Sequence, residues 1–516
     1  MTTHPPPVPA SRRRRGRYRA VAGATALAVV ALTAWSVLAP DGGTTPTARA
    51  DDTASDTDRP NVVVVMADDL DARVPFWDAM PQTAALLRDR GLVFEQAFSP
   101  DPTCCPARAS LYTGDLAHNT GVLENGDPDT VSGFDTFLAN GYEDDTVFRH
   151  LQDAGYATGF VGKWMNDVPA DYVPPDLDTY VGTTDTAAFS GYDYTLNENG
   201  TLVSYGSAEE DYVTDVLAAK SRDFVRESAA AGEPFHLLAG PTAPHAPMPP
   251  APRHADHTWV DATLPRSPNF DEADISDKPQ WLQENADLRS TVVGATVDEE
   301  YQDRMGSLQA LDDMVAGLIE EVRAAGELDE TYFVFTSDNG YNWGSHRLLQ
   351  KFAAYEESIR IPLVVAGPGV TAGSTAALAL LPDLAPTVLH LAGIQVEGLD
   401  TRTLVPLFDG GSPPGWRTDF LAEYGSDEYD TDLPAIIDVP KWRAVRTTTH
   451  IYIETYADEA DPDRVTDIEL YDLRQDPYQL ANLLAAPEVS AADSGLAAAL
   501  DARLAELETC SGSDCR

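Results

Sequence analysis

Short runs of apolar and β-branched residues recur along the chain from residue 61 onwards, and turn-forming residues bound them. The first run, Asn61–Ala67 (NVVVVMA), is apolar without alternation, which is typical of a strand buried on both faces of a parallel sheet. Further runs of the same character predict strands at Ala157–Gly162, Phe235–Gly240, 332–336 and 361–366.

Helical patterns separate these predicted strands. Residues 305–322 carry apolar side chains at every third or fourth position, and Gly326 follows where the pattern ends. Residues 146–153 predict a shorter helix that ends before Gly155. Strands that alternate with helices over most of the chain predict an α/β fold, with a large, mainly parallel sheet sandwiched by helices.

The pattern changes at residues 409–415 (DGGSPPG), which are a run of turn formers. Beyond them the sequence predicts two short strands and an alanine- and leucine-rich helix, at 442–446, 450–455 and 490–508. We therefore expect a main α/β domain over residues 51–410 and a small α+β subdomain over residues 411–516.

The first fifty residues have a different character. Six arginines lie between Arg12 and Arg19, an apolar run covers residues 20–39, and Ala48-Arg49-Ala50 ends the segment. A basic region, an apolar region and an A-x-A site are typical of an export signal. An uncleaved membrane anchor is the alternative, because twenty apolar residues can just span a bilayer. We expect a secreted protein or, in the alternative, an anchored one with its main domain outside.

Cysteine content fits export. Cys510 and Cys515 flank a short loop at the C-terminus and could form a disulfide outside the cytosol. Cys104 and Cys105 are adjacent, and neighbouring cysteines rarely bond to each other because the geometry is strained. This second pair therefore needs another explanation.

Acidic residues far outnumber basic ones. The 516 residues include 83 Asp and Glu against 35 Lys and Arg, a formal net charge of −48. Hydrophobic residues make up 43%, which excludes wholesale disorder. The charge argues against nucleic acid as a partner and against adsorption to anionic lipid.

Polar residues follow the predicted strands directly. Asp68-Asp69 follows the first, Lys163-Trp-Met-Asn166 the second, His245 comes shortly after the third, and Asp338-Asn339 follows the fourth. Ligands of open α/β sheets gather beyond the carboxyl ends of the strands. Two acidic pairs there could hold one hard cation, Ca²⁺ or Mg²⁺, through oxygen ligands. Ordinary turn and cap residues are the alternative for either pair alone.

The segment 104–114 (CCPARASLYTG) carries a further candidate site. Pro106 could begin a helix, which would place Cys104 at its positive end. A thiol there can be activated, whereas a buried structural cysteine is the alternative.

This segment resembles the sulfatase signature C-x-P-S/A-R-x-x-x-x-T-G, in which the first cysteine becomes Cα-formylglycine. The resemblance runs in order from about residue 60 to 484. The double cysteine and Lys163-Trp-Met-Asn166 are closest to the N-acetylglucosamine-6-sulfatase branch of this alkaline phosphatase superfamily. The other matching motifs are Thr336-Ser-Asp-Asn-Gly340, Lys351-x-x-x-Tyr355-Glu356, Ile361-Pro-Leu, and Glu469-Leu-Tyr-Asp-Leu473 with Asp476-Pro-Tyr478.

The resemblance implies hydrolysis of a sulfate monoester, either a small organic sulfate or a sulfated sugar, by a formylglycine made from Cys104. A formylglycine-generating enzyme is then a partner during maturation. Arg108 would stabilise the formylglycine, Lys163 and Lys351 would hold sulfate, and His245 or Lys351 would protonate the leaving alcohol. The implied metal ligands, for Ca²⁺ in the first place, are Asp68, Asp69, Asp338, Asn339 and the modified Cys104.

Two positions depart from the family pattern. Met165 and Thr120 stand where many sulfatases have histidines, so the base for sulfate elimination stays open. Asn166, His118 and His346 are secondary candidates for substrate binding.

The same superfold also supports a phosphonate or phosphodiester hydrolase. A non-catalytic glycan-binding protein is a further alternative if Cys104 is never modified. Because a long polyanion would be repelled by so acidic a chain, small esters or glycan ends are the favoured substrates.

Overall fold

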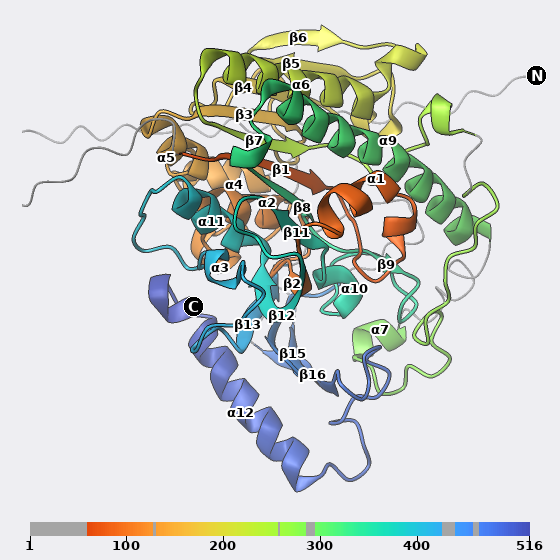
Figure 1. Cartoon of the computed structure of the whole chain (residues 1–516). Helices are drawn as coiled ribbons and strands as arrows, with labels where there is room; N and C mark the ends of the chain where they lie inside the picture. Colours follow the sequence, from red (N-terminus) through yellow and green to blue (C-terminus); the bar gives the residue numbers. More distant parts are fainter. Residues whose placement is uncertain (1–58, 127–130, 256–258, 285–294, 426–438, 458–463) are drawn as a thin grey trace, which may run out of the picture. The chain divides into compact units, whose positions relative to one another are not determined.

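Strand β1 (Asn61–Ala67) lies inside a ten-stranded sheet in the computed structural model of the chain (Figure 1). The order of the strands is β12-β2-β11-β8-β1-β7-β3-β4-β5-β6. The other strands are β2 (Leu92–Phe98), β3 (Ala157–Gly162), β4 (Thr179–Thr183), β5 (Thr195–Glu198), β6 (Thr201–Ser204), β7 (Phe235–Gly240), β8 (Thr331–Ser337), β11 (Leu363–Ala366) and β12 (Gly373–Leu380). The structure describes residues 59–126, 131–255, 259–284, 295–425, 439–457 and 464–516.

The centre of the sheet is parallel and its flanks are mixed. Strand β1 pairs in parallel with β7 and β8, and β3 pairs in parallel with β7 and β4. Strand β11 is antiparallel to β8, with Leu363 opposite Thr336. It runs the other way because the chain turns back at the edge where β8 ends. The predicted mixed, mainly parallel sheet is confirmed.

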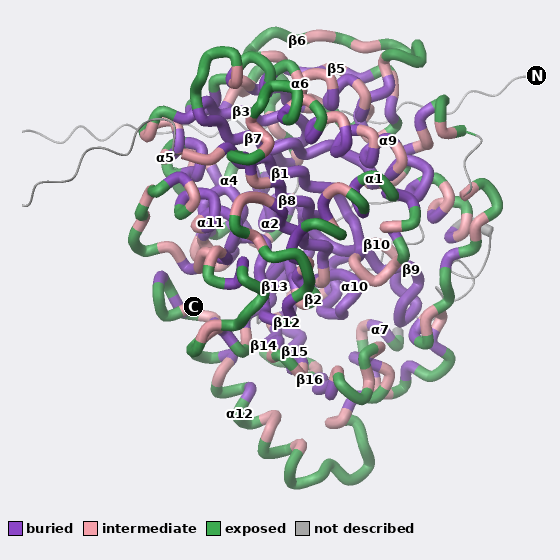
Figure 2. The backbone as a smooth tube through the Cα atoms, viewed as in Figure 1, coloured by how far each residue is buried: buried purple, intermediate pink, exposed green. Residues whose placement is uncertain are grey.

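Helices cover both faces of the sheet, as the alternation along β1 requires. Val63 and Val65 pack in one apolar cluster with helices α6 (Val213–Ala231) and α9 (Ala295–Ala325). Val62, Val64 and Met66 pack in a second cluster on the opposite face. The helices of that second layer are α2 (Cys104–Thr113), α5 (Val147–Asp153) and α11 (Leu384–Leu391). Figure 2 shows the strands buried between these layers.

Strand β1 illustrates how the sequence stabilises this arrangement. All seven of its residues are buried, and each enclosed valine contributes roughly 1.5–3 kcal/mol through removal of apolar surface from water. A charged residue at Val64, which is 1% exposed, would lose that term and bury an unpaired charge. The helix predicted at 305–322 lies within α9, which begins earlier than predicted.

A second, antiparallel sheet follows near the C-terminus. It consists of β13 (Asp419–Tyr424), β14 (Trp442–Thr447), β15 (His450–Tyr456) and β16 (Val465–Asp472), paired in chain order. Helix α12 (Ala491–Leu507) covers one face, where Leu500, Leu504 and Leu507 meet Val445 and Leu470. The predicted C-terminal α+β subdomain is confirmed, whereas its boundary after residue 410 stays a prediction.

The predicted export signal or anchor, residues 1–50, lies outside the described residues. Among the helices of the described part, none has the length and apolar character to cross a membrane.

Candidate functional site

Carboxylates from two neighbouring strands meet at one edge of the large sheet. Asp68 follows β1 and Asp338 follows β8, and the pairing of Ala67 with Ser337 places them side by side. The Asp69 backbone N–H donates to Asp338 Oδ1 at 3.1 Å. Asp68, Asp69 and Asp338 are all buried. The structure therefore brings together the acidic pairs that the sequence singled out.

Asp69 has a backbone conformation that needs support. Its φ of 64° lies in the left-handed region, which a residue with a Cβ adopts only when its surroundings hold it. Arg304 of α9 supplies part of that support, because its guanidinium donates to the Asp69 carbonyl and lies over the rings of Tyr341 and Trp343. The sequence analysis missed Arg304, because nothing in a helix with ordinary periodicity marks the one residue that faces a site.

Cys104 is the first residue of α2 and is buried beside these carboxylates. Its Sγ lies 3.9 Å from Asp68 Oδ1 and 3.0 Å from Lys351 Nζ. Burial raises the pKa of the thiol, although Lys163 and Lys351 oppose that effect. Activation of the thiol by the helix end stays a prediction, and the burial of Cys104 does not favour it. Desolvation outweighs the two lysines, and the direction of the pKa shift favours the protonated thiol in the unmodified side chain.

Arg108 lies one helical turn after Cys104, on the same face of α2. Its Nε and Nη2 donate to Asp338 Oδ2 at 3.0 and 2.8 Å, and Nη1 donates to the Lys163 carbonyl. Its Nη2 is also 3.7 Å from Asp68 Oδ2. Although burial lowers the pKa of Arg108, Asp338 and Asp68 raise it overall, so its charge is fixed.

Two lysines complete the cluster. Lys163 Nζ lies 2.9 Å from Asp68 Oδ2, and Lys351 Nζ lies 2.5 Å from Asp69 Oδ1. Burial favours the neutral amine, but the carboxylates outweigh it and raise the pKa of both lysines. Likewise burial raises the pKa of Asp69, and Lys351 and His245 lower it overall, to about 2. Both partners of each pair are charged at neutral pH.

His245 faces the cluster from the loop that follows β7. Its Nε2 lies 3.5 Å from Asp69 Oδ2, its Nδ1 lies 2.6 Å from the carbonyl oxygen of Ala246, and its ring stacks on Phe189. Desolvation lowers the pKa of His245 to about 4. The neutral ring donates Nδ1–H to the carbonyl, which leaves a lone pair on Nε2. At neutral pH the ring is therefore neutral, with Nε2 turned towards the Asp69 carboxylate.

The donor set fits a hard divalent cation. Ligand atoms of Asp68, Cys104 and Asp338 lie within 4.8 Å of one another, as do those of Asp68, Asp69 and His245. Asn339 Nδ2 donates to Asp69 Oδ1 and to the Gly340 carbonyl, so its Oδ1 is buried without a hydrogen-bond partner. A buried amide oxygen with no donor beside three carboxylates is the arrangement that Ca²⁺ or Mg²⁺ would satisfy.

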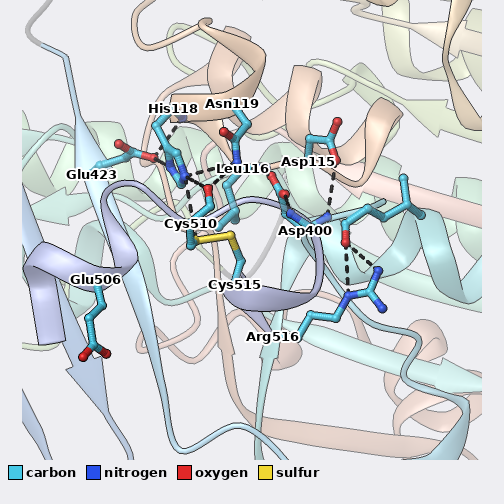
Figure 3. The surroundings of a disulfide bond; sticks show 12 residues. Asp115, Leu116, His118, Asn119, Asp400, Glu423, Glu506, Cys510, Cys515 and Arg516 are labelled. Atoms are coloured by element: carbon cyan, nitrogen blue, oxygen red, sulfur yellow. Dashed lines mark hydrogen bonds and ion pairs between the residues drawn. A yellow bond between two sulfur atoms is a disulfide. The ribbon is translucent and has the colours of Figure 1, made fainter. Parts of the chain in front are cut away.

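His118 lies elsewhere, beside the disulfide that joins Cys510 and Cys515 (Figure 3). Its Nδ1 lies 2.8 Å from Glu423 Oε1 and its Nε2 lies 3.1 Å from the Cys510 carbonyl oxygen. Both ring nitrogens are thus engaged with residues outside the carboxylate cluster. The disulfide is the pairing that the sequence predicted, and substrate binding by His118 stays a prediction that these contacts do not favour.

The remaining candidates differ in exposure. His346 is fully buried, with Nδ1 2.6 Å from Glu272 Oε2 and Nε2 3.2 Å from Asn269 Nδ2, so no ring nitrogen faces the cluster. Asn166 is half-buried and its backbone N–H donates to Cys105 Sγ at 3.3 Å. Met165 is buried in the apolar cluster around α2, where it cannot act as a base.

Comparison with known proteins shows which family this chain resembles over most of its length. The sulfatase family model matches residues 60–394, and the model for the C-terminal region of N-sulphoglucosamine sulphohydrolase matches residues 344–509. The N-acetylglucosamine-6-sulfatase of Capra hircus is 31% identical over 491 residues, which cover 89% of this chain and 85% of that protein. The extracellular sulfatase SULF-1 homolog of Drosophila melanogaster is 33% identical over 379 residues, which cover 71% of this chain and 33% of that protein.

Solved structures share the fold at lower identity. A protein solved in complex with its substrate D-glucosamine-2-N,6-O-disulfate has a TM-score of 0.66 and 22% identity, over 86% of this chain and 97% of that one. The phosphonate monoester hydrolase of Silicibacter pomeroyi has a TM-score of 0.65 and 21% identity, over 87% and 94% of the two chains.

Proposed function

This chain belongs to the sulfatase family and hydrolyses sulfate esters, and we propose that its substrate is a small sulfated sugar or the end of a sulfated glycan. A relative named N-acetylglucosamine-6-sulfatase and a similar structure bound to a sulfated glucosamine support this choice. The first compound to test is therefore 6-sulfated N-acetylglucosamine. The observation that carries the mechanism is the position of Cys104 Sγ, between the Lys351 ammonium and the Asp68 carboxylate.

Charge balance explains why an anionic ester would bind here. Asp68, Asp69 and Asp338 are matched by the three cationic side chains Arg108, Lys163 and Lys351. A divalent cation held by the carboxylates and Asn339 would leave the site with excess positive charge. We assign Ca²⁺ to this position, with Mg²⁺ as the alternative, because the three carboxylates and the Asn339 amide offer oxygen ligands.

A formylglycine at position 104 would supply the nucleophilic hydroxyl, and a divalent cation held by the carboxylates and Asn339 would supply positive charge beside it. Around that position Arg108 fixes the Asp338 carboxylate and stabilises negative charge. Lys163 and Lys351, both buried, bind the sulfate oxygens and offset the charge that develops there. Water is excluded from most of this cluster, which strengthens each of these interactions.

Proton transfer divides between two residues. Lys351 Nζ lies 3.0 Å from Cys104 Sγ and carries a proton, so it is the donor that we assign to the leaving alcohol. His245 presents a lone pair on Nε2, and we assign it as the base for sulfate elimination. Many sulfatases have histidines at the positions of Met165 and Thr120, and neither of these residues can act as that base here.

Maturation and location follow from the same assignment. We place the protein outside the cytosol, because the Cys510–Cys515 disulfide fits an oxidising compartment and a relative is named an extracellular sulfatase. The basic and apolar residues at 1–50 then act as an export signal, or as an anchor if they are not cleaved. A formylglycine-generating enzyme would modify Cys104.

Release of sulfate and the mass of the Cys104 peptide, measured on the same sample, test this function. We expect turnover of the sugar sulfate and a peptide lighter than the thiol form. Cys104→Ala should retain its circular dichroism spectrum and lose activity by roughly 10³-fold or more. Cys105→Ala is the matched control, because this cysteine is equally buried, and we expect it to keep activity within tenfold.

Two results would contradict the proposal. An unmodified thiol in fully active protein would show that Cys104 is not the precursor of the nucleophile. Faster turnover of a phosphonate monoester than of any sulfate ester would favour the alternative function, which a shared fold allows.

A further inference from the structure

Backbone strain is concentrated around Lys351. Four nearby residues other than glycine have positive φ, namely His346 (52°), Arg347 (64°), Gln350 (69°) and Phe352 (86°). A left-handed backbone crowds the Cβ atom, and it persists only where surrounding contacts over-determine it. The segment 346–352 therefore owes its shape to what holds it.

Arg347 holds the start of this segment. Its Nε donates to the Glu272 carbonyl at 2.8 Å and its Nη2 donates to the Ala273 carbonyl at 3.0 Å. The side chain is 7% exposed and spans from one loop to the other. Because a planar guanidinium reaches two successive carbonyls at once, it fixes the orientation of the loop as well as its distance.

His346 makes a second connection to the same loop. Its backbone N–H donates to the Asn269 carbonyl at 2.8 Å, and its Nδ1–H donates to Glu272 Oε2 at 2.6 Å. Asn269 Nδ2 donates in turn to Nε2 at 3.2 Å, and the ring lies 4.1 Å from the Tyr355 ring. Both ring nitrogens of His346 thus contact side chains of the loop that contains Asn269 and Glu272.

The other end of the segment is anchored to the C-terminal sheet. Trp442 Nε1 of β14 donates to the Phe352 carbonyl at 2.6 Å. Strand β10 (Leu349–Gln350) lies within the segment and pairs with β9 (Asn342–Trp343), which precedes the segment. Because both ends of segment 346–352 are fixed, its backbone is held in place. The Lys351 ammonium can therefore contact Asp69 and Cys104 Sγ.

We propose that Arg347 and His346 are positioning residues for Lys351. Neither has a described contact with Cys104 or the carboxylates, so they act only through the backbone of segment 346–352. Loss of either connection would let the segment leave its left-handed conformation and withdraw the ammonium. This inference rests on the role of Lys351 as proton donor in the proposed function.

Comparison of two esters tests the inference. An aryl sulfate such as 4-nitrophenyl sulfate has a good leaving group that needs little protonation, whereas a sugar sulfate needs the proton. Because Lys351 also binds the sulfate oxygens, we expect Arg347→Ala to lower kcat/KM on both esters, about 30-fold on the sugar sulfate and less than tenfold on the aryl sulfate. Arg347→Lys, which can reach one carbonyl, should recover part of the loss.

Gln350→Gly is the matched control. It removes a positive-φ side chain from the same segment without deleting either connection, so kcat on both esters should stay within twofold of the wild type. If Arg347→Ala does not fold, His346→Gln carries the test with the same expected pattern. Equal losses on the two esters, or no loss, overturn the inference. A wild-type chain that hydrolyses neither ester instead overturns the proposed function.

Discussion

Arg108 links three parts of the site through one guanidinium. It lies wholly inside the protein and joins the Asp338 carboxylate to the backbone of Lys163. Removal of one partner from such a buried pair leaves an uncompensated charge, which costs more than the pair itself contributes. Stability and catalysis should therefore fall together at this residue.

Arg108→Lys tests this coupling. A lysine keeps the charge but cannot donate in a fork, so we expect the free energy of unfolding to fall by about 3 kcal/mol and kcat/KM by about 100-fold. Urea unfolding and sulfate release measure the two effects. Arg474→Lys is the control, because Arg474 pairs with Asp472 on the surface, and it should leave both quantities unchanged. A stable but inactive Arg108→Lys protein would show that the arginine acts on substrate alone.

At the scale of elements, the last residues of the chain fasten several segments together. We call residues 510–516 the carboxy-terminal hook. Gly512 donates to Asp400 Oδ1 at 2.6 Å, and the Cys510 carbonyl faces His118 and Asn119 of helix α3 (Ala117–Thr120). Figure 3 shows Cys510 facing His118 and Asn119 beside the disulfide. The hook thus ties the C-terminus to the helix that follows the signature helix α2.

The hook makes stability depend on pH. His118 Nδ1 faces Glu423, and its Nε2 faces both the Cys510 carbonyl and the amide donor Asn119 Nδ2, at 3.2 Å. Burial lowers the pKa of His118, but Glu423 and the Cys510 carbonyl raise it overall, so the fold favours the protonated ring. When folding raises the pKa of a histidine, the protonated ring stabilises the folded state. This stabilisation is complete at pH values below the pKa of the unfolded chain, about 6.5, and it is lost as the pH rises through the pKa of the folded state. For His118→Gln we expect a loss of about 2 kcal/mol at pH 5.5 that shrinks towards pH 9, by urea unfolding.

His150→Gln provides the control for this measurement, because His150 contacts the exposed Asp145 on the surface. Its effect should be small at every pH. A His118→Gln loss that stays constant from pH 5.5 to 9 would mean that packing, not the charge of the ring, holds the hook.

At the scale of the whole molecule, the net charge of −48 opposes the approach of a polyanion. The cluster at the sheet edge is positive only once a cation is bound, and its field is short-ranged in salt. A small monosulfated sugar should therefore reach the site more easily than a long, highly sulfated chain.

Salt dependence tests this selectivity. Between about 20 and 200 mM NaCl the Debye length falls below about 10 Å, so we expect kcat/KM for a highly sulfated oligosaccharide to rise roughly fivefold. For 6-sulfated N-acetylglucosamine the change should stay within twofold. Initial rates at matched temperature and pH measure both, and a rate that falls with salt on the oligosaccharide would reveal a local basic surface instead.

Much of the fold could be predicted because local patterns carry it. The run Asn61–Ala67 has too many β-branched residues to be anything but a buried strand, and residues 305–322 repeat at the helical period. Strand β11 was predicted as one of the same series, yet it runs antiparallel. The direction of a strand depends on where the preceding loop brings the chain back to the sheet, and a local sequence pattern does not predict that position.

By itself the sequence picked out the candidate site residues, because Asp68, Asp69, Cys104, Arg108, Lys163 and Lys351 stand in motifs at the ends of strands or the start of a helix. Only the tertiary structure decided their protonation, their partners and the hidden supports. Burial keeps the Cys104 thiol protonated, and a carbonyl selects the tautomer of His245. Arg304 and Arg347 reach the site through the backbone of other segments. The charge state, solvation and backbone strain of a residue depend on neighbours that are distant in the chain, whereas a motif depends only on the order of residues along it.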